Sequence, residues 1–122
     1  MKKLLFIVSL LIAFVFDAKC QNADVPPNAE PGKCYAKCIK PESTPQNIVW
    51  TNWEEVVCGS DITPRLISDV VNALKNKGYK VDTSATVMNA DIKAELTKFQ
   101  KTFELPVGNL NLKTLAALGV SY

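Results

Sequence analysis

The chain has 122 residues, of which 14 are basic and 12 acidic, and it contains no histidine. This length holds one small domain with accessory segments and excludes a large multidomain enzyme. The near-neutral charge excludes the basic footprint of a nucleic-acid-binding protein, and the lack of histidine removes the commonest general base and metal ligand.

The first residues have the layout of an export signal. Lys2 and Lys3 precede an apolar run over residues 4–16 that only Ser9 interrupts, which is typical of a secretory signal peptide. The run is shorter than the about 20 apolar residues that a membrane helix needs. We therefore expect a signal peptide over residues 1–20 and a location in the periplasm, with association to the outer membrane as a further option.

The residues around Cys20 leave two options for processing. Ala18 and Cys20 place small side chains where a signal peptidase reads them, so we expect cleavage that leaves Gln21 as the new N-terminus. Lipid attachment at Cys20 is the less favoured alternative, because Lys19 and Asp17 stand where a lipoprotein signal has a small and an aliphatic residue. Cleavage removes three lysines and one aspartate, which leaves eleven basic and eleven acidic residues and a formal charge of zero.

Cysteines 34, 38 and 58 indicate disulfide bonding in an exported chain. On a helix, Cys34 and Cys38 would share one face at the upper end of disulfide geometry. Closure of Cys34 or Cys38 to Cys58 is the alternative, and we favour it because a longer closed loop restrains the unfolded chain more. If Cys20 is removed or lipidated, one thiol is left over. Three thiols without histidine or a CxxC spacing make a zinc site unfavourable, so we expect no metal and no cofactor.

Residues 21–58 are expected to form a proline-rich, cysteine-containing extended leader. Prolines at 26, 27, 31, 41 and 45 exclude long helices there. The stretch NIVWTNWEEVVC predicts a short strand, with Trp50 and Trp53 as anchors in the core. A sugar-stacking pair is the less favoured alternative for these two tryptophans. Glu54 and Glu55 would point to opposite faces of that strand, so they do not form the carboxylate pair of a glycosidase. We expect no enzyme.

Residues 59–122 carry three helix patterns, so the expected fold class is mainly α. The first helix has Thr63 as N-cap and Pro64 at its first position, and it ends at Gly78. The second follows Asn89, with a buried stripe of Ile92, Leu96, Phe99 and Phe103. The third follows Asn111 and ends at Gly119, with the inward residues Leu112, Leu115, Ala116 and Leu118.

Three stretches of this helical region share the order and spacing of a known family: LISDVVNALKNKGY, VMNADIKAELTKFQ and LPVGNLNLKTLAALGV. Together they resemble the helical peptidoglycan-binding domain of secreted cell-wall proteins over roughly residues 59–120. The stretch PGKCYAKC also resembles a segment that precedes this domain in short envelope proteins of Bacteroidota. The resemblance implies a three-helix fold and a Gram-negative envelope protein that binds peptidoglycan.

The loop between the first two helices departs from the family pattern. Where the family commonly carries Asp-Gly, a further glycine and a threonine, this chain has Ala85, Thr86, Asn89 and Ile92. Glycine reaches positive φ and permits close approach of a ligand. The loop is therefore expected to take a different path, with Asn89 supplying left-handed geometry in place of glycine.

The candidate ligand-binding residues gather around this loop. They are Tyr79 as a stacking surface and Asp82, Thr83, Asn89 and Gln100 as hydrogen-bonding groups. A neutral polar groove suits the amides, carboxylates and hydroxyls of peptidoglycan. We therefore predict a non-catalytic periplasmic protein that binds peptidoglycan and anchors or positions an envelope component. The alternative is a protein-interaction subunit of an outer-membrane or periplasmic complex that uses a degenerate form of the fold.

Overall fold

The computed structural model describes residues 19–20 and 25–122. Along the chain come strands β1 (Cys34–Ile39) and β2 (Trp50–Val56), the 3-10 turn η1 (Gly59–Asp61), and helices α2 (Pro64–Asn76), α3 (Ala90–Thr102) and α4 (Leu112–Leu118). Apart from its last two residues, the expected signal peptide lies outside the described residues. Within the described part, no helix is long and apolar enough to cross a membrane.

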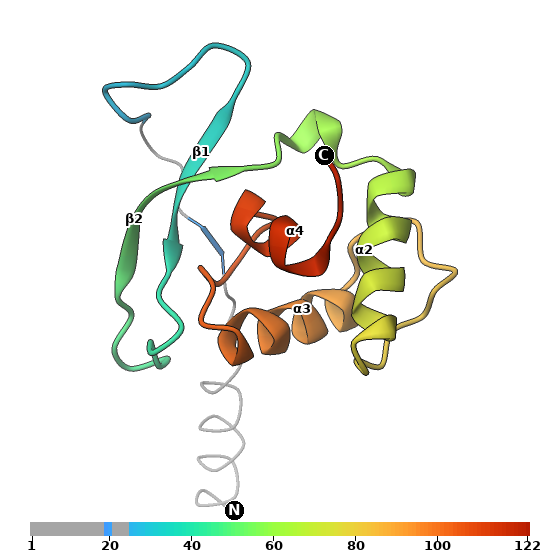
Figure 1. Cartoon of the computed structure of the whole chain (residues 1–122). Helices are drawn as coiled ribbons and strands as arrows, with labels where there is room; N and C mark the ends of the chain where they lie inside the picture. The colour runs from blue at the N-terminus through green and yellow to red at the C-terminus, as the bar shows by residue number, and fades with distance from the viewer. Residues whose placement is uncertain (1–18, 21–24) are drawn as a thin grey trace, which may run out of the picture.

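The expected mainly α fold class is wrong, because an antiparallel hairpin precedes the three helices. Figure 1 shows β1 and β2 side by side, next to the helices. Cys34 lies opposite Val56 and Lys37 lies opposite Trp53, with a register shift after Lys37. The fold of the described chain therefore combines α and β structure, and residues 34–56 of the expected proline-rich leader form a hairpin.

The alternation of residues in β1 explains why this segment forms a strand. Ala36 and Cys38 are buried while Lys37 between them is exposed, which is the period of two that a strand requires. In a strand, residues four apart are separated by about 13 Å at roughly 3.3 Å per residue. Cys34 and Cys38 therefore cannot bond to each other, and each needs a partner outside β1.

The strand predicted within residues 47–58 is confirmed as β2, but the burial expected for its tryptophans is wrong. Trp50 is 40% exposed. Trp53 is half-buried, and the Lys37 Nζ atom lies 5.2 Å from the centre of its ring. The inward positions of β2 are Glu54 and Val56. Since neighbouring side chains alternate across a strand, Trp53 points to the outer face.

The three predicted helix starts are confirmed by their caps. A side-chain oxygen of each cap residue accepts a hydrogen bond from the amide three residues later, as N-caps do: Thr63 from Leu66, Asn89 from Ile92, and Asn111 from Thr114. Two inward placements are wrong, because Phe103 is 54% exposed and Ala116 is exposed. Phe103 is the C-cap of α3, where the helix leaves the core, and its ring packs at 4.7 Å from that of Phe99.

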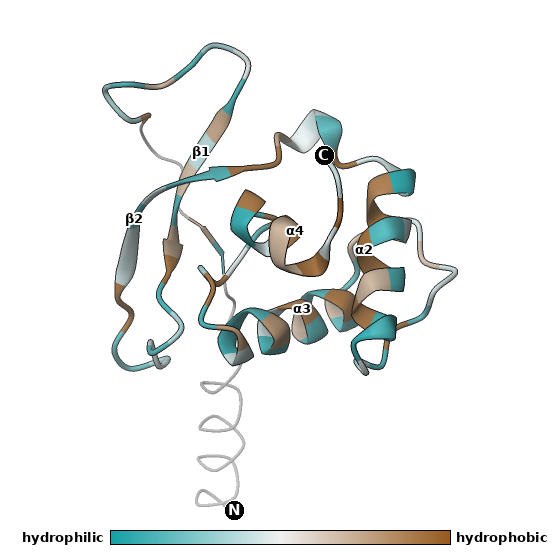
Figure 2. Ribbon diagram, viewed as in Figure 1, coloured by the Kyte–Doolittle hydropathy of each residue, from teal (hydrophilic) through white to brown (hydrophobic). Residues whose placement is uncertain are grey.

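The main core lies between the three helices, whose apolar sides Figure 2 shows in brown. Val70 and Leu74 of α2, Phe99 of α3 and Leu115 of α4 are buried in one cluster. Val57, just after β2, and Leu110 belong to the same cluster. The end of the hairpin therefore contributes to the core of the helical part.

The segment between α3 and α4 joins the hairpin to the helices by backbone hydrogen bonds. Ile39 and Val107 exchange two bonds, with N–O distances of 3.0 Å and 2.7 Å. The Val57 amide donates to the carbonyl oxygen of Leu110 at 2.8 Å. These bonds connect the two sides of the boundary expected after residue 58. The hairpin is consequently held by the turn that precedes α4.

Two disulfides complete this attachment. Cys34 bonds to Cys58, which confirms the favoured closure of β1 onto Cys58. Cys38 bonds to Cys20, so no free cysteine remains among the described residues. The expectation of a leftover thiol is therefore wrong. A leftover thiol is expected only if Cys20 is lost or lipidated on export. Without Cys20, Cys38 has no partner.

Candidate binding site

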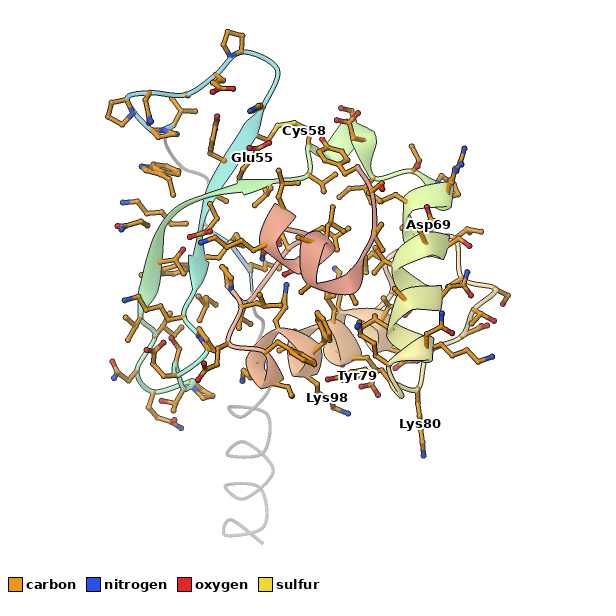
Figure 3. The ribbon with its side chains drawn as sticks, in the orientation of Figure 1. Glu55, Cys58, Asp69, Tyr79, Lys80 and Lys98 are labelled. Carbon is orange, nitrogen blue, oxygen red and sulfur yellow. A yellow bond between two sulfur atoms is a disulfide. The ribbon has the colours of Figure 1, made fainter. Side chains whose placement is uncertain are left out.

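The loop over residues 79–88 brings two predicted site residues together. Asp82 and Asn89 line a hollow of about 380 Å³ between this loop and α3. We call it the polar hollow, and its charged and amide side chains are Lys80, Asp82, Asn89, Asp91, Glu95 and Lys98. Figure 3 labels Lys80 and Lys98 at this side of the molecule. The hollow therefore offers both hydrogen-bond donors and acceptors.

Asp82 is fixed by its own loop. Its Oδ1 atom accepts hydrogen bonds from the Ser84 amide at 2.9 Å and from the Ser84 hydroxyl at 2.7 Å. The hydroxyl bond first, and the amide bond second, hold the pKa of the Asp82 carboxyl below its usual range, so the group is an anion at neutral pH. Among the described residues, the Oδ2 atom has no hydrogen-bond partner. A ligand can therefore bond to it without breaking the loop.

Asn89 sits at the N-terminus of α3. Its Oδ1 atom caps the helix by accepting from the Ile92 amide at 2.9 Å. Its backbone is extended, with φ of −81° and ψ of 174°, so the expected left-handed geometry is wrong. An N-cap residue takes the extended region, and this role excludes the left-handed one. The side-chain NH₂ of Asn89 donates to no described residue, so it remains for a ligand.

The charged groups of the polar hollow are only weakly paired. Lys98 and Glu95 form an ion pair at 3.4 Å, in which the Lys98 side chain is 67% exposed. The Glu95 side chain is only 16% exposed, but the Lys98 ammonium is open to water, and surface pairs contribute about 0 to 1 kcal/mol. Lys98 and Glu95 can therefore give up their ion pair and bind charged groups of a ligand at a small cost in free energy.

Tyr79 and Thr83 do not line the polar hollow. The Tyr79 ring is half-buried and packs edge-on to the Phe99 ring, with centroids 5.8 Å apart and planes at 79°. This ring belongs to the margin of the core and is not the open stacking surface that was expected. Thr83 is half-buried between Asp82 and Ser84. The structure therefore keeps two of the five predicted residues at one place.

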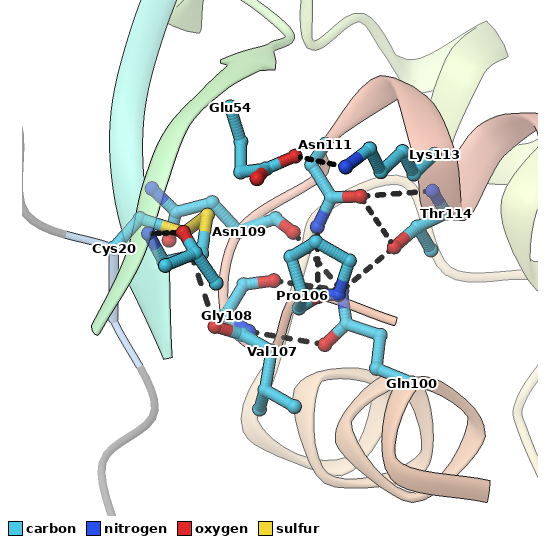
Figure 4. Close-up of a disulfide and its surroundings, with 12 residues drawn as sticks. Cys20, Glu54, Gln100, Pro106, Val107, Gly108, Asn109, Asn111, Lys113 and Thr114 are labelled. Atoms are coloured by element: carbon cyan, nitrogen blue, oxygen red, sulfur yellow. Dashed lines mark hydrogen bonds and ion pairs between the residues drawn. A yellow bond between two sulfur atoms is a disulfide. The ribbon is translucent and has the colours of Figure 1, made fainter. Parts of the chain in front are cut away.

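Gln100 lies elsewhere and is completely buried. Its Nε2 atom donates to the Gly108 carbonyl at 2.8 Å and to the Thr114 hydroxyl at 3.1 Å, and its Oε1 atom accepts from the Gly108 amide at 3.1 Å (Figure 4). The side chain therefore holds the turn before α4 and does not face the polar hollow. Its spacing of four from the buried Leu96 is the sequence signal for this burial.

Asn111 and Thr114 extend the contacts of Gln100 into a buried network. The Asn111 Nδ2 atom donates to the Pro106 carbonyl at 2.8 Å, while its Oδ1 atom accepts from the Thr114 amide and hydroxyl, each at 2.8 Å (Figure 4). Within the described chain, no buried side-chain nitrogen or oxygen lacks a partner. A fully satisfied network of this kind fixes one conformation. The sequence pattern predicts Asn111 only as a helix cap.

Glu54 joins the hairpin to α4 by an ion pair. Its carboxylate pairs with the Lys113 ammonium at 2.9 Å, and its side chain is 11% exposed. Glu55 points the other way and lies 3.8 Å from the Lys33 ammonium. The two neighbouring glutamates therefore lie on opposite faces of β2, as the strand pattern predicts.

Gly108 is the tightest point of the turn, and alanine there is expected to destabilise the protein. Its φ is +119°, and an added Cβ would lie 3.0 Å from both the backbone nitrogen and the sulfur of Cys20. We expect Gly108→Ala to cost about 2 to 4 kcal/mol of unfolding free energy in urea titrations, since strained backbone and steric overlap add. Gly119 has φ of +76° and open space around it, so Gly119→Ala should cost about 1 kcal/mol. Equal losses in the two variants would contradict the contact with Cys20.

A second hollow, of about 520 Å³, lies between the hairpin and the helices. Cysteines from both disulfides line it, together with apolar residues of β2 and α3. Among the described residues, no group of three or more cysteine, aspartate or glutamate side chains is placed to hold a metal ion.

No protein-family model matches this chain, and neither a curated protein nor a solved structure matches it.

Proposed function

We propose that this chain is a non-catalytic, exported protein that binds peptidoglycan in the polar hollow and so anchors or positions an envelope component. One observation supports the proposal most directly. Asp82 and Asn89 lie together in that hollow, and each keeps a hydrogen-bonding atom that no described residue uses. The likeness of the helical stretches to peptidoglycan-binding domains points in the same direction.

The chemistry of the polar hollow suits a peptidoglycan fragment. Stem peptides carry carboxylates, amides and free ammonium groups, while the glycan strands carry hydroxyls. Lys80 and Lys98 can bind carboxylates, and Asp82 and Asp91 can accept hydrogen bonds from amide or ammonium groups. The volume of about 380 Å³ falls in the range of roughly 300 to 1,000 Å³ that small-molecule sites occupy.

The loop is held in shape although it lacks glycine. Ala85, Val81 and Met88 pack against a buried cluster of Ile67, Val71 and Ile92. Apolar packing onto α2 and α3 therefore orders the loop without glycine. A loop that is already ordered binds at a lower entropic cost than one that must be ordered by its ligand.

Sedimentation with intact peptidoglycan sacculi tests the proposal. The disulfide-bonded protein is expected to pellet with sacculi, and a variant with Asp82→Ala and Asn89→Ser is expected to bind at least about tenfold more weakly, a loss of about 1.4 kcal/mol. Serine keeps the N-cap of α3 because it caps about as well as asparagine. The variant therefore keeps the start of α3 and removes the Asp82 carboxylate, with its two hydrogen bonds from Ser84, and the Asn89 amide.

A matched control makes the same two chemical changes outside the polar hollow. Asp69→Ala with Asn72→Ser alters exposed residues of α2, and this variant should bind as the wild type does. Thermal melts of all three proteins check that they are folded. A folded wild-type protein that stays in the supernatant, or equal binding by both variants, would contradict the proposal.

A second candidate function is a subunit that binds a protein of an outer-membrane or periplasmic complex. The hairpin gives it one favourable observation, because Ile48 and Trp50 are 43% and 40% exposed. Large exposed apolar side chains that lie close together are typical of protein-interaction surfaces. Under this alternative, Trp50→Ser would abolish binding to the partner protein. The wild-type protein without its partner would not pellet with sacculi and would stay in the supernatant.

A further inference from the structure

The position of Cys38 calls for a partner that belongs to the folded protein. Cys38 is completely buried on β1, in a cluster with Ala36 and Val56. The half-buried Cys20 packs against the same cluster and bonds to Cys38. Since residues four apart in a strand cannot reach each other, and Cys34 is bonded to Cys58, Cys20 is the one cysteine of this chain left for Cys38.

The turn before α4 is shaped to receive Cys20. At Gly108, an added Cβ would lie 3.0 Å from the Cys20 nitrogen and sulfur and 3.3 Å from the carbonyl carbon of Lys19. The Cys20 sulfur also lies 4.0 Å from the Val107 carbonyl oxygen. The Gln100 side chain fixes the Gly108 backbone by donating to the Gly108 carbonyl oxygen and accepting from the Gly108 amide. A fixed glycine with positive φ therefore leaves room for the chain at Cys20.

We propose that Cys20 remains in the mature protein as the disulfide partner of Cys38, that it carries no lipid, and that the export signal is removed at a peptide bond before Cys20. This replaces the cleavage after Cys20 that the sequence pattern predicts. A thioether-linked lipid would consume the sulfur that bonds to Cys38, so lipidation and this disulfide exclude each other. The inference concerns processing and does not depend on peptidoglycan binding.

Removal of the export signal and formation of the Cys20–Cys38 bond need only water and an oxidant of an oxidising compartment. Signal removal is hydrolysis, in which one water adds across the cleaved peptide bond. Formation of the Cys20–Cys38 bond removes two protons and two electrons from the two thiols. A thiol–disulfide oxidoreductase accepts the electrons, and its own disulfide becomes a dithiol.

Peptide mapping of the exported protein, recovered from the periplasm without reduction, tests the proposal. Digestion by trypsin together with a glutamate-specific protease separates the four cysteines into peptides 20–33, 34–37, 38–42 and 56–65. We expect peptide 20–33 linked to 38–42 and peptide 34–37 linked to 56–65. Intact mass should place the N-terminus before Cys20 and show four hydrogens fewer than the reduced protein.

Thiol counting provides an independent measurement. Under denaturing conditions, maleimide should label no cysteine of the wild-type protein and one cysteine, Cys38, of the Cys20→Ser variant. A wild-type protein that begins at Gln21 and carries one labelled thiol would overturn the proposal. So would an acyl group on Cys20, or a bond between peptide 38–42 and peptide 56–65.

Discussion

Replacement of Gln100 by leucine is expected to lower the free energy of unfolding by about 3 to 5 kcal/mol, although leucine has a similar size and is apolar. The Gln100 side chain is completely buried and makes hydrogen bonds to Gly108 and Thr114. Leucine leaves the Gly108 amide and its carbonyl without these partners in the core. Each buried group that loses its partner costs about 1 to 3 kcal/mol.

Urea denaturation followed by circular dichroism measures this loss. Thr102→Ala is the control, because Thr102 is exposed near the end of the same helix and surface changes of this kind stay within about 0.5 kcal/mol. Total stabilities of small proteins are only about 5 to 15 kcal/mol, so the Gln100→Leu variant should be close to unfolding at physiological temperature. A loss below about 1 kcal/mol would show that the network does not hold the turn.

Removal of the Cys34–Cys58 disulfide is the second large effect that we expect. Cys34→Ser and Cys58→Ser should each cost about 2 to 4 kcal/mol, because the bond closes a loop with a sequence separation of 24 and restrains the unfolded chain. The double variant should cost no more than either single variant, since all three lack the same bond. Urea titrations under non-reducing conditions measure the three losses.

The reduced wild-type protein is the matching reference for this series. Reduction opens both disulfides, so it should destabilise the protein more than the double serine variant does. Additive losses from Cys34→Ser and Cys58→Ser would contradict the pairing, because they would mean that the two cysteines act in separate bonds.

The helical half of the molecule could be predicted from local sequence signals. Thr63, Asn89 and Asn111 precede amphipathic stretches, and the structure confirms all three as N-caps. Such signals are local, because the cap side chain and the amide it accepts from lie within one turn. Proline at the first position of α2 and glycine after α4 set the ends by the same local chemistry.

The hairpin and the cysteine pairing depend on contacts between distant residues, which local signals do not contain. The spacing of Cys34 and Cys38 fits one face of either a helix or a strand. Cys20 was assigned to a removed segment on a short processing pattern alone, whereas its partner Cys38 is 18 residues away. The strand β1 was missed because five prolines dominated the interpretation of its surroundings, although none of them lies within Cys34–Ile39.

The candidate site shows the same division. Asp82 and Asn89 are close in sequence, and the loop brings them to one hollow. Gln100 comes two residues after Lys98, which lines that hollow, but its side chain faces the core instead. Its polar character suggested a surface, while its position on the apolar stripe of α3, four residues after Leu96, indicated burial. The stripe was the better guide, because a buried amide is tolerated when all its hydrogen bonds are made.

Backbone amide chemical shifts in a titration with soluble disaccharide-peptide fragments test most directly whether the polar hollow binds peptidoglycan. The proposal predicts saturable shifts at Asp82, Asn89 and Asp91, with amides of the turn before α4 unchanged. Shifts confined to the hairpin, or no shifts at millimolar fragment concentration in a folded protein, would contradict it.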